Sequence, residues 1–423
     1  MKVSKRNKVL SVIFSILVFA GLLSGIASAE VTKIKLWQHL DRPDLPYYYN
    51  LIDEFNRTHP DIFVEFELVP WASAYEKYLM ALIAGNPADV IFHSPTWGSY
   101  FWDMGALEPL DSYIAEWDKA DEIYESAWES SKASYDEPIF GIPVYHMANY
   151  LYYRADWYEE LGLGVPETMD DFLDAATKLT GDIDGDGRVD RYGFGMRGAR
   201  GGNAMWVAFV TPAVDGQWVD EDGNCTFRRE EAIEQNQWYV DLFRKHRVTP
   251  PTAPSDGFAE IIEGFKNGLT AMTAHHIMSA GGMIDALGDE NVGVTIYPSL
   301  DGKRASDLGL HHYVIPKACK DKEAAFTFAT WMSERNQVTY FAENYGVIPV
   351  IKNLDDTHPQ LMGNRFFRTS VESIPFASNP PCLETLGEFT EQAWPASFQQ
   401  ALLGQITSEQ MMNRIADVLE GKK

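Results

Sequence analysis

Cysteine and basic residues are both scarce in this sequence of 423 residues. There are three cysteines, Cys225, Cys319 and Cys382, and 35 lysines and arginines stand against 61 aspartates and glutamates. Three cysteines allow at most one disulfide, and none of them has the C-x-x-C spacing of a redox or zinc motif. The formal net charge of −26 repels nucleic acid and anionic membranes, so we expect no nucleic-acid partner. It also favours a neutral or cationic ligand over an anionic one.

Long hydrophobic runs are missing outside the N-terminus. A basic stretch from Lys2 to Lys8 precedes the apolar segment Val9–Leu23, and the A-x-A sequence Ala27–Ala29 follows it. This order is typical of a secretory signal peptide, so we expect residues 1–29 to be cleaved; a retained N-terminal anchor is the alternative. No cysteine near the cleavage point could accept a lipid. The prediction is therefore a periplasmic or extracellular protein without a lipid anchor.

The chain is longer than one hydrophobic core usually fills, so two lobes are predicted. In the first lobe, strands and helices alternate: Lys33–Gln38, Tyr47–Thr58, Ile62–Val69, a helix from Ser73 to about Gly85, and Ala88–His93. This alternation predicts a parallel sheet with helices on both faces. Ligands bind outside the carboxyl ends of the strands of such sheets. That rule selects Trp37, Gln38, His39, Trp71, Ser94, Thr96 and Trp97.

The second lobe is predicted to begin near Asn149. Its expected helices and strands are Pro166–Leu179 with Thr168 as the cap, Glu230–Lys245, Phe258–Asn267, Leu269–Thr273, Val292–Tyr297, Gly387–Leu403 and Ser408–Leu419. The helix Lys322–Arg335 is assigned to the first lobe. The predicted division of the chain is 30–145 with 298–338 for the first lobe, and 146–297 with 339–423 for the second.

The segment Gly141–Leu163 joins the two predicted lobes. It begins with Gly-x-Pro, continues as a Tyr- and Val-rich apolar run, and ends in an amphipathic helix. A chain that leaves one sheet and starts another has this pattern. We therefore expect a hinge at Tyr145–Asn149 and a second one at Tyr297–Ser299.

Seven short motifs follow one another along most of the mature chain. They lie in Asp53–Glu65, Ala84–Val90, Gly105–Leu110, Tyr152–Arg154, Phe265–Thr273, Lys322–Ala325 and Tyr345–Val350. Together with Gly141–Leu163 they resemble the family 1 extracellular solute-binding proteins, the maltodextrin-binding-protein-like receptors of sugar-importing ABC transporters. The resemblance implies an α/β, two-lobed, type II periplasmic-binding-protein fold, in which each lobe is a mainly parallel sheet flanked by helices. It also implies capture of a sugar or oligosaccharide between the lobes, delivery to membrane permease subunits, and no enzymatic activity. We expect a monomer.

The sequence departs from the family pattern at three places. Arg154 stands where relatives have Asn, and His275-His276 and His311-His312 stand where they often have Gly-Pro-Trp and Gly-Gly. The two histidine loops face the ligand in relatives, so the resemblance leaves the identity of the sugar open. His275, His276 and His311 are therefore candidate ligand-binding residues. A zinc site built from these histidines is the weaker alternative.

Aromatic residues are plentiful, at 13% of the chain. Sugar C–H faces stack on aromatic rings, and sugar hydroxyls pair with amides and carboxylates. Tyr145, Asn149, Asn203, Trp206 and Trp394 complete the candidate ligand-binding set. For each tryptophan, packing in the core is the alternative.

The acidic segment 182–190 has the spacing of a calcium-binding loop. Carboxylates occupy positions 1, 3, 5 and 9 of an EF-hand-like loop, with glycine at position 6 and a backbone carbonyl at position 7. The expected ligands are Asp182, Asp184, Asp186, Arg188 through its carbonyl, and Asp190. Position 12 is Gly193 and supplies no carboxylate. We expect a structural Ca²⁺, with an ion-free acidic turn as the alternative, and no organic cofactor.

Two other functions fit parts of the sequence. An exported chain rich in acids and tryptophan is also typical of a secreted glycoside hydrolase, but no segment presents a recognisable pair of catalytic carboxylates. Among binding functions, the negative charge leaves a polyamine or a sugar alcohol open beside a sugar. Arg197 and Arg200 could form a local anion site.

Overall fold

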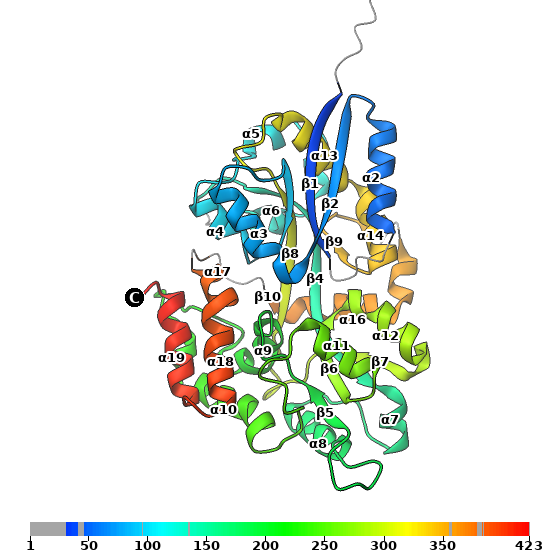
Figure 1. The fold of residues 1–423 in the computed structure, drawn as a ribbon, viewed down its shortest axis with the longest axis vertical. Helices are drawn as coiled ribbons and strands as arrows, with labels where there is room; N and C mark the ends of the chain where they lie inside the picture. The colour runs from blue at the N-terminus through cyan, green and yellow to red at the C-terminus, as the bar shows by residue number, and fades with distance from the viewer. Residues whose placement is uncertain are drawn as a thin grey trace, which may run out of the picture.

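The protein is described here by a computed structural model that covers residues 31–40, 46–94, 96–133, 136–354, 358–378, 383 and 385–422. The expected signal peptide and Cys382 lie outside these residues. Figure 1 shows two lobes stacked along the long axis, which we call the upper and the lower lobe. Within the described residues, no helix is long and apolar enough to cross a membrane.

The upper lobe is built on a mixed sheet in the order β2-β1-β3-β8-β4, and the short strand β9 (Ile348–Pro349) pairs with β4. These strands are β1 (Thr32–Leu40), β2 (Ile62–Pro70), β3 (Val90–His93), β8 (Ser306–Val314) and the first half of β4 (Gly141–Arg154). β1 runs parallel to β2 and β3, whereas β8 runs antiparallel to both of its neighbours. Ile34 and Leu36 of β1 are buried while Lys33 and Lys35 are exposed, as the period of two along a strand requires.

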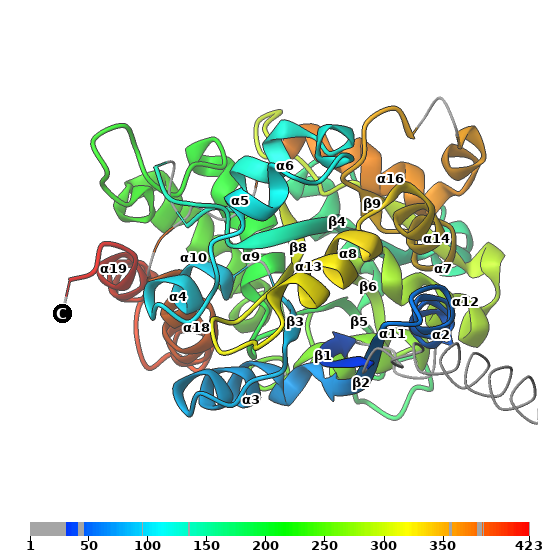
Figure 2. The same ribbon diagram turned by 90° about the horizontal axis from the view of Figure 1, so that it is seen from above.

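Helices cover both faces of the upper sheet, with α2 and α13 on one side and α3 and α4 on the other (Figure 2). The upper-lobe helices are α2 (Tyr47–Thr58), α3 (Trp71–Ile83), α4 (Gly98–Asp103), α5 (Asp111–Ile114), α6 (Glu125–Glu129), α13 (Lys322–Met332) and α14 (Arg335–Tyr345). The face of α2 predicted from its spacing, Tyr48, Leu51, Ile52 and Phe55, is the buried face. The predicted α/β architecture with helices on both faces is therefore confirmed for this lobe, but the predicted mainly parallel sheet is wrong, because β8 pairs antiparallel with both β3 and β4.

The lower lobe holds the second half of β4 with shorter strands and most of the C-terminal helices. Its elements are α7 (Ala155–Glu160), α8 (Met169–Leu179), β5 (Tyr192–Gly195), α9 (Asn203–Val210), α10 (Glu230–Arg244), α11 (Phe258–Lys266), β6 (Thr270–His276), α12 (Ala280–Leu287), β7 (Val292–Thr295), α16 (Arg365–Ser373), β10 (Ala377–Ser378), α17 (Leu386–Glu388), α18 (Trp394–Leu402) and α19 (Ser408–Leu419). Thr168 caps α8 as predicted: its hydroxyl accepts from the Asp171 amide at 3.1 Å, and the Asp171 carboxylate accepts from the Thr168 amide at 3.0 Å.

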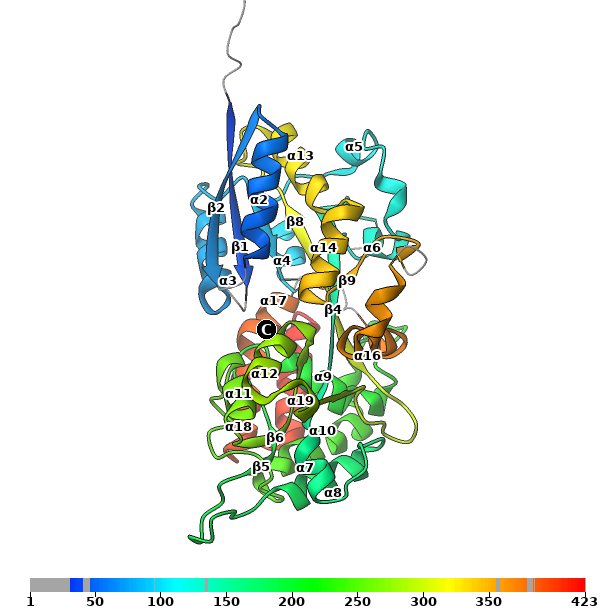
Figure 3. The same cartoon turned by 90° about the vertical axis from the view of Figure 1, so that its right-hand side faces the viewer.

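One long strand, β4, passes through both lobes (Figures 1 and 3). Its residues from Gly141 to Ala148 pair with β8, and those from Asn149 to Tyr153 pair with β6. The hydrophobic cores divide at the same point, since Met147 packs in the upper core and Tyr150 in the lower one. The predicted first hinge at Tyr145–Asn149 thus coincides with the change of partner strand.

The second crossing lies later than the predicted hinge at Tyr297–Ser299. Tyr297 is buried in the lower core, and the carbonyl of Ser299 accepts from the Met169 amide at 3.0 Å, which anchors this segment to α8. The chain crosses along β8 instead, because Ser306 and Asp307 pair with β10 while Leu310 packs in the upper core.

The third crossing is also later than the predicted boundary at residue 338. That boundary falls inside α14, whose Phe341 and Tyr345 pack on α2 in the upper core, with the Tyr48 and Phe341 rings 4.9 Å apart. The upper core continues to Ile351, and the lower core resumes at Leu354. The predicted helices did not include α14.

Arg154, which departs from the family pattern, has a structural role at the start of α7. Its Nε and Nη2 donate to the two carboxylate oxygens of Asp156 at 2.8 and 2.5 Å. Its guanidinium carbon lies 4.0 Å from the Trp157 ring centroid, in a cation–π contact. The Arg154 side chain therefore contacts Asp156 and Trp157 in the lower lobe and does not point into the space between the lobes.

Candidate functional site

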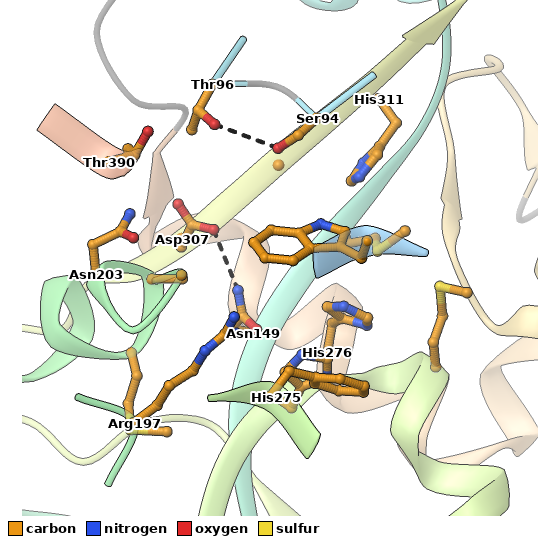
Figure 4. Close-up of a pocket in the computed structure, with 18 of the residues that line it drawn as sticks. Ser94, Thr96, Asn149, Arg197, Asn203, His275, His276, Asp307, His311 and Thr390 are labelled. Carbon is orange, nitrogen blue, oxygen red and sulfur yellow. Dashed lines mark hydrogen bonds between the residues drawn. The ribbon is translucent and has the colours of Figure 1, made fainter. Parts of the chain in front are cut away.

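A pocket of about 140 Å³ lies between the two lobes. Figure 4 shows polar side chains converging on it from β4, β6, β8 and the loops around them. Ten of the fifteen residues predicted to bind ligand line this pocket: His39, Trp71, Ser94, Thr96, Tyr145, Asn149, Asn203, His275, His276 and His311. His39 and Ser94 lie at the carboxyl ends of β1 and β3, where the strand-end rule placed them.

Two predicted residues on β1 lie outside the pocket. Trp37 stacks on Tyr78 with ring centroids 5.8 Å apart, and its Nε1 donates to Glu67 at 2.7 Å. Gln38 is fully buried and points to the opposite side of the sheet, where its Oε1 accepts from the Tyr313 hydroxyl at 3.3 Å. Gln38 misses the pocket because successive side chains on a strand point to opposite faces. Trp37 lies on the same face as His39 but two residues further from the end of the strand.

Three predicted tryptophans are core residues, which corrects their assignment as pocket residues. Trp97, Trp206 and Trp394 all have 0% exposure. Trp206 donates its Nε1 to Asn236 at 2.7 Å inside the lower core, and Trp394 stacks on Phe398 at 4.7 Å. From the sequence alone, the tryptophans near predicted loops could not be divided into core residues and pocket residues. That division depends on how helices such as α10 and α18 pack around them.

The sequence reasoning missed the acidic residues of the pocket. Asp307 and Glu391 both line it, as does Arg197, which was considered only as part of an anion site. A signal for Asp307 was present, because Asp307, Gly309 and His311 are spaced two apart on β8 and so share one face. Glu391 and the adjacent Thr390 lie in the turn of helix between α17 and α18, and no local pattern marks them.

The Asp307 carboxylate is the main ionisable group that faces the pocket. Burial raises its pKa to about 6, and the hydrogen bond from Asn149 Nδ2 at 3.3 Å opposes that rise (Figure 4). The group is mostly ionised at neutral pH and is then a pure acceptor. It is suited to bind a ligand that presents hydroxyl donors.

Two of the pocket histidines, His275 and His311, are neutral. Burial lowers the pKa of His275 and of His311 well below the ordinary value. His275 Nδ1 lies 2.8 Å from Ser279 Oγ, and the His311 ring stacks on Phe92 with centroids 5.3 Å apart. A neutral imidazole has one donor and one acceptor nitrogen, so these rings add hydrogen-bonding groups without adding charge.

Trp71 forms an aromatic wall of the pocket and is itself held by two arginines. The guanidinium carbons of Arg200 and Arg197 lie 4.4 and 5.5 Å from its ring centroid. Glu391 completes this charged group: its Oε2 lies 3.0 Å from Arg200 Nη1, and its Oε1 accepts from Trp97 Nε1 at 3.0 Å. Glu391 and Arg200 balance each other, and Asp307 and Arg197 are the other two charged residues that line the pocket.

The predicted calcium loop brings three of its carboxylates together. Oxygens of Asp182, Asp184 and Asp190 lie within 4.8 Å of one another, and all three residues are exposed. Asp186 is not in this group, and its Oδ1 accepts from the Arg188 amide at 2.8 Å. Over the described residues this is the one set of three acidic, histidine or cysteine side chains close enough to share a metal, and the pocket histidines do not belong to it.

Comparison with known proteins adds family and fold. A family model described as bacterial extracellular solute-binding protein matches residues 41–337. A mannitol-binding protein from Pseudomonas aeruginosa is 25% identical over 388 residues, which cover 85% of this chain and 86% of that protein. A solute-binding protein from Thermotoga lettingae bound to alpha-D-tagatose superposes with a TM-score of 0.82 at 24% identity, covering 92% of this chain and 99% of that one. Maltose-bound MalE3 of T. maritima gives 0.80 at 25% identity, covering 92% and 100%. The predicted type II periplasmic-binding-protein fold is thereby confirmed.

Proposed function

Because this chain belongs to the bacterial extracellular solute-binding protein family, as its motifs predicted, we propose that it captures a neutral, polyhydroxylated solute between its lobes. We infer that it delivers this solute, a sugar or sugar alcohol, to the membrane permease of an ABC importer from the periplasm or the extracellular space. The observation that carries the proposal is the interlobe pocket, which combines the Trp71 ring with a dense set of hydrogen-bonding groups.

The size of the pocket favours a small ligand. A volume of about 140 Å³ is below the ~300–1,000 Å³ that is typical for sites that hold drug-sized molecules. One monosaccharide or one acyclic sugar alcohol fits this scale better than a long oligosaccharide. The similarity to a mannitol-binding protein and to a tagatose-bound protein supports the same size class.

The charges of the pocket favour a neutral ligand over a polyamine. A diamine needs carboxylates at both of its ends, but Glu391 is already engaged by Arg200 and Trp97. Only Asp307 would remain for the ligand, and Arg197, which also lines the pocket, would repel a cation. A ligand that presents many hydroxyls can instead use Asp307, Asn149, Asn203 and the neutral imidazoles as partners.

The same contacts weigh against a glycoside hydrolase. That chemistry needs one carboxylic acid and one carboxylate on either side of a glycosidic bond. Among the described pocket residues the carboxyl groups are Asp307 and Glu391, and Glu391 is engaged by a hydrogen bond from Trp97 and an ion pair with Arg200. We therefore favour binding without catalysis.

Thermal-shift measurements with D-mannitol, D-tagatose, maltose and putrescine test this function. We expect a rise in melting temperature with at least one of the first two, none with putrescine, and no cleavage of maltose. Trp71→Ala should remove the shift, whereas Trp37→Ala, which changes a tryptophan outside the pocket of the same lobe, should keep it. Cleavage of maltose, or a shift with putrescine alone, would overturn the proposal.

We also propose that Asp182, Asp184 and Asp190 hold a structural Ca²⁺. Their carboxylates are hard oxygen ligands within 4.8 Å of one another, and the bridge between Gly181 and Arg191 closes the loop around them. Calorimetric titration with Ca²⁺ should show one site that the Asp184→Asn variant loses. Equal heats for the two proteins would refute the site.

A further inference from the structure

Arg200 reaches from the lower lobe across the cleft to the first turns of α3. Its Nη2 donates to the carbonyl oxygens of Trp71 and Ala72 at 3.0 and 3.1 Å. Its Nη1 donates to Glu76 Oε1 at 3.1 Å, and its guanidinium carbon lies 4.4 Å from the Trp71 ring centroid. One lower-lobe side chain therefore grips both the backbone and the aromatic ring of an upper-lobe helix.

Glu391 holds the same guanidinium from the lower lobe and makes a second bond across the cleft. Its Oε2 lies 3.0 Å from Arg200 Nη1, while its Oε1 accepts from Trp97 Nε1 of the upper lobe at 3.0 Å. The side chains of Arg200 and Glu391 are only 18% and 6% exposed, whereas that of Glu76 is 64% exposed. Solvent therefore screens the Arg200–Glu391 pair far less than it screens the Arg200–Glu76 pair.

We propose that Arg200 is a positioning residue that latches the lower lobe to α3 and thereby holds Trp71 against the pocket. All the contacts that form this latch are made by the protein alone, so the closed arrangement of the lobes is populated without ligand. A ligand that binds only the closed form then binds more tightly, because its apparent affinity is proportional to the fraction of the protein that is already closed. The affinity part of this inference rests on the proposed function, but the latch does not.

A distance measurement on the ligand-free protein tests the latch. Nitroxide labels at Glu54→Cys on α2 and Glu234→Cys on α10, both exposed positions in different lobes, report the separation of the lobes. A Cys382→Ser background removes one native thiol, while Cys225 and Cys319 are buried. Double electron–electron resonance should give a short distance between the two labels, as expected for closed lobes. The same labelled protein carrying Arg200→Gln should give a longer distance.

Two further variants separate the latch from a general loss of structure. Glu76→Gln should leave the distance unchanged, because this partner is exposed and contributes little. Arg200→Lys should restore the closed form only in part, because a single ammonium cannot make the forked contacts to α3 and Glu391. Equal melting temperatures of Arg200→Gln and Glu76→Gln would show that the lobes themselves remain folded.

The same distances decide the proposal whether or not a sugar binds. An open distance in the unsubstituted ligand-free protein, or an unchanged closed distance with Arg200→Gln, would overturn the latch. If D-tagatose binds, Arg200→Gln should weaken its binding by about 5- to 100-fold, the range of typical coupling free energies. Absence of D-tagatose binding would count against the proposed function, but it would not change the distance between the labels in the ligand-free protein, which tests the latch.

Discussion

Replacing Asp307 by asparagine should stabilise the ligand-free protein while it weakens ligand binding. The carboxylate is held between the lobes, where burial raises its pKa to about 6 from an ordinary value of 3.8. Between these two values the folded protein binds more protons than the unfolded chain does. Its stability therefore falls as the pH rises through this window, and the cost is fully present above pH 6. Asparagine has the same shape but carries no charge, so it avoids this cost.

The size of both effects follows from the pKa. A shift of about two units corresponds to ~3 kcal/mol at 1.36 kcal/mol per unit, and solvent in the open pocket should reduce the gain from Asp307→Asn to about 1–2 kcal/mol. For a chain of this length that is a rise in melting temperature of about 1–2 °C. Loss of a charged acceptor should weaken ligand binding by about five- to tenfold.

Melting curves and binding titrations over a range of pH test this reasoning. The stability gain of Asp307→Asn should be present at pH 7.5 and disappear near pH 4, where the wild-type carboxyl group is protonated. Wild-type affinity for whichever of D-mannitol or D-tagatose binds should fall about tenfold from pH 7 to pH 5, while that of Asp307→Asn should stay flat. A variant that is destabilised at pH 7.5, or that keeps the pH dependence, would refute the assignment.

Two more predictions concern the folded framework. Burial lowers the pKa of His93 to about 4. Between pH 6.5 and pH 4 the unfolded chain therefore binds a proton at this residue that the folded protein does not bind, and the free energy of unfolding should fall as the pH drops through this window. In urea titrations, His93→Gln should make that fall shallower. If the free energy of unfolding falls equally steeply with pH in His93→Gln and in the wild-type protein, His93 does not contribute to this pH dependence. Thr168→Ala removes the capping box of α8 and should cost about 1 kcal/mol by urea denaturation, whereas Thr177→Ala, at an exposed position inside the same helix, should cost about half of that or less. Equal losses would mean that the cap has no special role.

Much of the fold could be predicted because the elements carry their own local patterns. Tyr47–Thr58 and Ser408–Leu419 begin and end where their spacing indicated, and Thr168 caps α8 as its sequence predicted. The path of the chain between the lobes was harder, because it depends on which core receives a given apolar face. Phe341 of α14 could pack in either lobe as far as its own sequence shows.

The candidate site was predictable where strand geometry alone selects a residue. His39 and Ser94 follow strand ends, and Asn149 marks the change of partner of β4. Trp206 and Trp394 could not be separated from pocket residues, since an aromatic ring serves a core and a sugar site equally well. Glu391 follows α17, which packs against α4 of the other lobe, and no local sequence pattern predicts this contact.

The strand order of the upper sheet also governs how this protein can fold. β3 pairs with β8 rather than with β4, so the strand that ends at His93 finds its partner more than two hundred residues further along the chain. An N-terminal fragment that stops before Ser306 lacks the strand that lies between β3 and β4, and it exposes the open edges of both. The upper sheet therefore cannot be completed until β5, β6 and β7 of the lower lobe have been made, although its first strands are the earliest to be made. Contacts of such long sequence separation are formed slowly, so we expect the pairing of β3 with β8 to be a late step in folding.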